Sequence, residues 1–261
     1  MFPTLLFLHT ALAGSPDATP PRADSTYVVA VVSGIGARRT TAEDTLHLSR
    51  VERDTWSLSQ RGGESVWEDG DSVRRVDPSA PRDGDPWPIV LQRAVGSVPA
   101  TVRFDDEGRP VELLDAEGWS QAARTAIEQA DLPAVARLSG EALIDPDGLI
   151  RTLGRSFVGT PSEAWSRPDR LAGVDVLRRE TCERTRERGL TTWTCRGSAT
   201  GPDGNNTQLQ DAATWTTVTI DRRGLVSVED GWSGTLVHLD RDGQTITDSP
   251  VGGRRLLQRL P

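Results

Sequence analysis

The sequence predicts an α+β protein with one large antiparallel β-sheet and two or three central helices packed on one face. Most of the chain alternates apolar and polar residues between Asp- and Gly-rich turns, which is typical of antiparallel strands. Helical periodicity is confined to the middle of the chain, near residues 116–158. The segment 101–119 is repeated with variation at 217–232, so two related β-units flank the helical centre. This order of strands, helices and strands favours the α+β class.

The stretch Thr217 to Thr247 reads as three short strands joined by two D-x-x-G turns. Asp opening and Gly closing such a turn indicates a type I turn with a G1 bulge, because Gly enters the left-handed region at little cost. The expected register places Ile220 opposite Val226 and Val218 opposite Val228. All four side chains should then share one face of the sheet.

The N-terminal half should be a meander of short strands. Gly62-Gly63 and Asp69-Gly70-Asp71 read as turns within it. A Pro-rich loop at 77–88 carries Trp87. Strands are predicted at 25–32, 45–51, 55–59, 66–67, 73–76, 89–95, 100–104 and 111–114.

Two longer helices are predicted in the centre, with a further helical turn or two expected at 133–138 between them. Apolar residues from Trp119 to Ala130 form one stripe at helical spacing, with Asp115 as the expected N-cap. Asp145 and Pro146 suit the start of a second helix. Strands should resume at Val174, and Arg254 to Leu260 reads as a short amphipathic tail that packs at an edge.

The N-terminus has the composition of a secretory signal peptide. Residues 1–13 contain an apolar run that ends in Ala-Leu-Ala, and 14–25 read as a disordered linker. The remainder, 26–261, is expected to be a single β-rich domain. No later apolar run approaches the length of a transmembrane segment. The protein is therefore expected to be exported, periplasmic or secreted, and soluble after cleavage.

Two cysteines fit an exported protein. Cys182 and Cys195 lie on the two arms of a hairpin that turns at Arg188-Gly189. Counting outward from the turn places them opposite each other in a non-hydrogen-bonded pair, where Cα atoms are roughly 4.5 Å apart. That separation suits a disulfide. A different register of the hairpin would separate them, and two free thiols remain the alternative if the protein is not exported.

Composition excludes several function classes. The net charge of −8 argues against nucleic-acid binding. The chain has no Lys, so a P-loop, a Schiff base and a Ser-Lys dyad are excluded. His47 and His238 sit in strand patterns and suggest no metal site, and no cofactor is expected. A pair of carboxylates is the enzymatic route that stays open, as in a glycosidase.

Four of the eight Trp residues are flanked by Gly, Pro or charged residues. Such positions could line a groove, although core or rim packing is the alternative. The four are Trp67, Trp87, Trp165 and Trp232.

The export signal, the antiparallel meanders and the central helices resemble the half-barrel folds of LolA/LppX-type periplasmic lipoprotein and lipid carriers. The D-x-x-G hairpins at 105–108 and 221–224 are similar to those of uncharacterised secreted bacterial proteins of this shape. The resemblance is architectural and covers roughly residues 25–255. It implies a curved, half-barrel-like sheet whose concave face, partly plugged by helices, holds an apolar ligand.

These observations predict an exported, non-enzymatic protein that binds a hydrophobic or lipid ligand, or an envelope protein. A structural or protein-interaction module with a filled core is the first alternative. A carboxylate-based hydrolase is the second.

Overall fold

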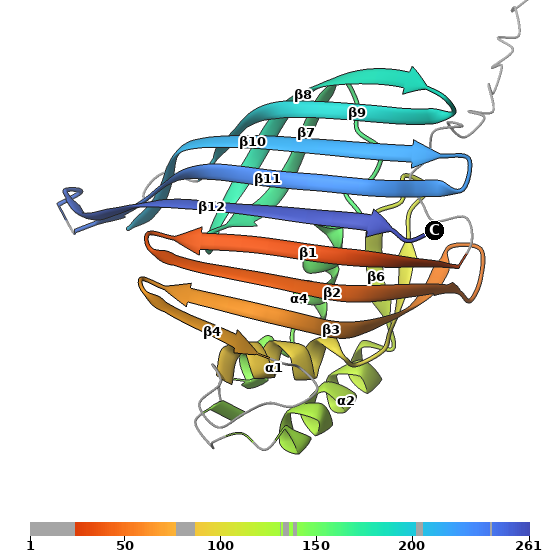
Figure 1. Ribbon diagram of the computed structural model, residues 1–261, viewed down its shortest axis with the longest axis horizontal. Coiled ribbons are helices and arrows are strands. Elements are labelled where there is room, and N and C mark those ends of the chain that lie inside the picture. The colour runs from red at the N-terminus through yellow and green to blue at the C-terminus, as the bar shows by residue number, and fades with distance from the viewer. Residues whose placement is uncertain are drawn as a thin grey trace, which may run out of the picture.

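The described residues form a single 12-stranded antiparallel sheet, with three α-helices and one short 3-10 helix described in full (Figure 1). The fold was determined as a computed structural model, which describes residues 24–76, 87–130, 132, 136–137, 140–201, 206–240 and 242–261. The predicted signal peptide, most of the predicted linker and the Pro-rich stretch 77–86 lie outside the described residues.

The strands follow the expected meanders but are longer than predicted. They are β1 (Ser25–Ile35), β2 (Arg38–Arg50), β3 (Thr55–Asp69), β4 (Ser72–Val76), β5 (Ala100–Phe104), β6 (Pro110–Leu114), β7 (Ala164–Leu171), β8 (Val174–Glu187), β9 (Leu190–Thr200), β10 (Thr207–Asp221), β11 (Gly224–Leu239) and β12 (Thr245–Arg259). The helices are α1 (Trp87–Gly96), α2 (Ala116–Gln129), η1 (Glu141–Leu143) and α4 (Pro146–Gly154). Asp115 caps α2 as predicted, because its side chain accepts a hydrogen bond from the Gly118 amide.

The sheet order is β6-β5-β3-β2-β1-β12-β11-β10-β9-β8-β7, with β4 paired to β3. Strand β12 therefore lies at the centre, between β1 and β11. The prediction of an edge-packed tail at 254–260 was wrong. This segment pairs on both sides, with Tyr27 opposite Arg259 on β1 and Ser227 opposite Gln258 on β11.

Three further predictions were wrong in the local structure. The run Ile89 to Val95 is part of α1, because a short apolar run does not by its periodicity distinguish a strand from a buried helix. Strand β3 continues through Gly62-Gly63, where a turn was expected. Strands resume at Ala164, before the predicted Val174.

The β10–β11 hairpin differs from its expected register by one position. Val218 pairs with Val228 as predicted, but Ile220 lies opposite Leu225 because the register shifts between Thr219 and Ile220. Val226 is thus the extra residue of the bulge. The hairpin β5–β6 has a similar shift at Phe104.

One face of the sheet, here called the inner face, carries the buried side chains and faces the helices. A first apolar cluster fills one end of this face, where Tyr27 and Leu257 pack with Phe157. A second cluster, which includes Leu171 and Leu236, lies on β7 to β12 away from the helices. Charged side chains lie buried between the two clusters.

The sheet curls strongly toward its β7 edge. Arg167 of β7 contacts Asp230 of β11 at 2.5 Å, although β8, β9 and β10 lie between these strands in the sheet. Figure 1 shows β7 passing behind β11 and β12. This curvature brings the β7 edge across the inner face, so that a hollow forms between β7 and the centre of the sheet.

Candidate functional site: a charged cavity on the inner face

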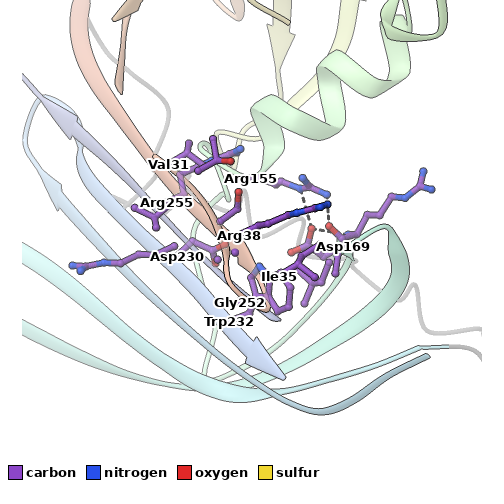
Figure 2. Close-up of a pocket in the computed structure, with 18 of the residues that line it drawn as sticks. Val31, Ile35, Arg38, Arg155, Asp169, Asp230, Trp232, Gly252 and Arg255 are labelled. Carbon is purple, nitrogen blue, oxygen red and sulfur yellow. Dashed lines mark hydrogen bonds and ion pairs between the residues drawn. The ribbon is translucent and has the colours of Figure 1, made fainter. Parts of the chain in front are cut away.

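A cavity of about 470 Å³ opens on the inner face between β1, β11, β12 and the β7 edge (Figure 2). Its walls combine apolar side chains such as Val31, Ile35 and Leu171 with the backbone of Gly252 and Gly253. Its volume lies within the range of small-molecule sites. This space is called the inner cavity below.

Strand alternation places the charged residues of the cavity. Val31, Arg255, Asp230 and Thr216 form one continuous row across β1, β12, β11 and β10. Residues in such a row point to the same face. On β8, Arg178 stands two residues after buried Val176 and therefore also points inward.

Arg178 is the centre of a buried ion network. Its side chain is fully buried and lies 3.2 Å from Asp169, 3.0 Å from Asp230 and 2.6 Å from Glu180. It also donates to the hydroxyl of Thr216 at 3.1 Å. Buried charges persist only when they are paired and hydrogen-bonded, and three carboxylates around one guanidinium meet that condition.

Two more arginines complete the network from the β7 side. Arg167 pairs with Asp230 and stacks over the Trp165 ring, 4.9 Å from its centroid. Arg155, just after α4, pairs with Asp169 at 3.1 Å and donates to the carbonyl of Arg170. The network therefore holds the β7 edge in place over the inner face.

The pairing fixes the charge states of Asp169 and Arg178. Burial alone would raise the pKa of Asp169, but Arg167, Arg155 and Arg178 outweigh it and hold this pKa below its usual range. Burial alone would lower the pKa of Arg178, but Asp230 and Glu180 keep it above its ordinary value. Asp169 and Arg178 thus both remain charged near neutral pH.

Arg255 lines the cavity beside this network but has different partners. It donates to the carbonyl of Thr152 at 3.0 Å and to the hydroxyl of Ser156 at 3.4 Å. Thr152 lies in the last turn of α4, whose free carbonyls attract a cation. Burial lowers the pKa of Arg255 to about 10, and the charge of Arg155 adds to this effect.

The four Trp residues predicted to line a groove separate into two pairs. Trp67 and Trp232 line the inner cavity. Trp232 lies across Gly253, where a Cβ atom would meet its indole nitrogen at 2.8 Å, so only Gly leaves room for the ring. Trp87 begins α1 and is 40% exposed, and Trp165 packs against the first apolar cluster.

The predicted disulfide is present. Cys182 and Cys195 are paired across β8 and β9, with Cα atoms 4.0 Å apart. They lie in the first apolar cluster and outside the cavity. The two His residues bond threonine hydroxyls on neighbouring strands, His47 with Thr26 and His238 with Thr207.

Sequence reasoning missed the charged residues of the site. Charged residues in strands are usually solvent-exposed, so Arg178 and Glu180 gave no obvious signal. A signal did exist: both continue the buried alternation of Val174 and Val176, which ends at Cys182. Arg255 was missed because the amphipathic pattern of its segment, 254–260, predicts a tail at the edge of the sheet.

Comparisons with known proteins bear on the fold alone. No protein-family model matches the sequence, and no curated protein matches it significantly. Among solved structures, the chain is similar to lipovitellin, in a structure titled for lipid–protein interactions, with a TM-score of 0.50 and 10% identity. The match covers 93% of this chain and spans 25% of the lipovitellin chain. The architecture is therefore shared with part of the lipovitellin chain.

The described residues contain neither a candidate membrane-spanning helix nor a candidate metal site. None of the described helices is long and apolar enough to span a membrane. Within the described ranges, no group of His, Cys, Asp and Glu is arranged to hold a metal ion.

Proposed function

We propose that this protein binds a hydrophobic, lipid-like ligand in the inner cavity and that it acts as a carrier or binding protein, without catalysing a reaction. The observation that carries the proposal is the cavity itself. Apolar walls formed by Val31, Ile35 and Trp232 stand beside a charged floor formed by Arg255 and Asp230. An amphiphile suits such a site, because its apolar tail can contact the walls while its polar head contacts the charged floor.

The state of the carboxylates supports a binding role over a hydrolase. Asp169, Glu180 and Asp230 all pair with arginines. A glycosidase needs one carboxylic acid whose pKa is raised, so that it can donate a proton. The pKa of Asp169 is instead depressed.

The fold is compatible with the proposed ligand class, and the disulfide supports the proposed cellular compartment. The lipovitellin-like architecture is compatible with a lipid ligand, and the resemblance to LolA/LppX-type carriers stays a prediction. A disulfide suits an oxidising compartment, so we propose that the protein is exported, periplasmic or secreted. An envelope protein as partner, and the absence of nucleic-acid binding, also remain predictions.

Tryptophan quenching tests the proposal. The purified protein would be titrated with spin-labelled stearic acid and with its primary amide, both of which quench nearby indole rings. Saturable quenching by either probe is expected. Because Trp67 and Trp232 line the cavity, Trp67→Phe and Trp232→Phe should each remove part of the quenching.

Trp87→Phe is the matched control, because Trp87 lies at the start of α1. Quenching that changes as much in this control as in Trp232→Phe would place the probe elsewhere. Failure of both probes to bind saturably would overturn the proposal and would favour a protein-interaction module.

A further inference from the structure

The buried ion network and Arg255 together have one more cation than anion. They contain four guanidinium groups, Arg155, Arg167, Arg178 and Arg255, and three carboxylates, Asp169, Glu180 and Asp230. The first three arginines each form an ion pair with at least one of these carboxylates. The excess is one positive charge.

Arg255 carries that excess. Within the described chain, its hydrogen bonds go to two neutral acceptors, the carbonyl of Thr152 and the hydroxyl of Ser156. Arg254, the next residue on the same strand, points to the opposite face and pairs with Glu229 at 3.0 Å. The outer arginine therefore forms a direct ion pair with a carboxylate, and the inner one forms none with the described residues.

The position of Arg255 explains why an added anion would be favourable. It lies beside Asp230 in the cross-strand row, at the boundary between the charged network and the apolar wall of Val31. Asp230 and Asp169 act on Arg255 from a distance, but it forms an ion pair with neither. A half-buried cation that forms no direct ion pair gains when an anion with oxygen acceptors arrives. Gly253, on the same face two residues before Arg255, is covered by the Trp232 ring, so the apolar wall lies directly beside the guanidinium.

We propose that Arg255 binds the anionic headgroup, a carboxylate or a phosphate monoester, of a single-tailed amphiphile. The tail lies along Val31, Ile35 and Trp232 toward the mouth of the cavity. This inference rests on the proposed function, and it assigns the ligand class and the residue that selects it. Arg155 stays paired with Asp169 and supports the site by its charge.

The test compares the affinities of the same two probes. At about pH 8 stearic acid is ionised in dilute solution and its primary amide is neutral, while their sizes match. A charge-assisted hydrogen bond gives the acid an advantage of about ten- to a hundredfold in Kd over the amide. Arg255→Gln should abolish this preference by weakening the acid alone, and Arg254→Gln should preserve it.

The ratio of the two affinities does not depend on the overall stability of a variant. Arg255→Lys, which keeps the charge, should retain part of the preference if Arg255→Gln folds poorly. Equal binding of acid and amide by the unchanged protein would overturn this inference and leave the proposed function standing. Failure of both probes would remove both.

Competition experiments show which headgroup the site prefers and whether it binds an amphiphile or a free anion. Lysophosphatidic acid should displace the probe and a monoacylglycerol should compete at least tenfold more weakly. Inorganic phosphate alone should not displace the probe at concentrations where lysophosphatidic acid does. Displacement by inorganic phosphate that depends on Arg255 would show a site for a free anion and would overturn the assignment to an amphiphile.

Discussion

Arginine supplies every cationic side chain of the buried network, and its geometry makes that network possible. The guanidinium of Arg178 bonds Asp169, Asp230 and Glu180 together, which a flexible, point-like ammonium would not match. The absence of Lys from the chain is consistent with a network built from arginine, but it does not explain why these arginines are buried. Removal of one partner would leave a buried charge uncompensated, at a cost of about 3–5 kcal/mol.

Tyr27 gives a prediction about alkaline pH. Its hydroxyl is fully buried and donates to the carbonyl of Leu225, and burial raises its pKa from 10.0 to about 12. The unfolded chain begins to lose this proton near pH 10, whereas the folded protein keeps it until about pH 12. The stabilising contribution, about 3 kcal/mol for a shift of this size, is complete below pH 10 and is lost as the pH rises to 12.

The chain has one Tyr, so the absorbance of tyrosinate reports this group directly. Its titration midpoint should lie near 12 in the folded protein and near 10 in denaturant. Tyr27→Phe should lose the part of the alkaline destabilisation that comes from this group. A midpoint near 10 in the folded protein would contradict the buried position of the ring.

Individual site residues were predictable where the local sequence carried a signal. Flanking Gly, Pro or charged residues make four Trp residues candidates for a groove, and two of them, Trp67 and Trp232, line the cavity. Their meeting in one cavity depends on the pairing of β1 with β12, which joins segments far apart in the chain. Local sequence contains no information about that pairing.

At the scale of elements, β12 shows most clearly what local patterns miss. Its sequence, with Gly252-Gly253 followed by charged and apolar residues, has little of the β-branched character of a central strand. Gly253 is needed for another reason, because Trp232 occupies the space over it. The disulfide hairpin was predicted correctly since its turn and its register are both local.

The central position of β12 predicts the effect of two neighbouring substitutions. Leu257 is fully buried between Val29 and Val228, so Leu257→Ala should destabilise the protein by about 2–5 kcal/mol. Leu256 points to the outer face, so Leu256→Ala should destabilise the protein by about 1 kcal/mol or less. Urea denaturation measures both. Similar small effects for the two residues would indicate the edge tail that the sequence suggested.

At the scale of the whole molecule, the fold class was predictable because it follows from the order of element types. The antiparallel sheet with helices on one face was expected from strands, helices and strands in succession. The two related segments both form D-x-x-G hairpins, β5–β6 and β10–β11. They diverge afterwards: the first enters α2 at Ala116, and the second continues as a strand through Trp232.

The shared core predicts a single unfolding transition. The first apolar cluster joins Tyr27 and Leu46 of the N-terminal strands with Val218 and Leu225 of the C-terminal strands. The second apolar cluster lies on the C-terminal strands alone, but the first cluster couples these strands to the N-terminal ones. Far-ultraviolet circular dichroism and tryptophan fluorescence should therefore give coincident urea curves. Two separated transitions would show that the halves are independent.

The pairing of β1 with β12 also has a consequence during synthesis. Val29 on β1 cannot meet Leu257 until nearly the whole described chain has been made. Until then, β1 presents an unpaired and apolar edge, which is a template for association with other chains. Contacts of such long sequence separation also form slowly. A nascent chain of this protein should therefore depend on a chaperone that shields β1, and its yield should be limited by the wait for its final strand.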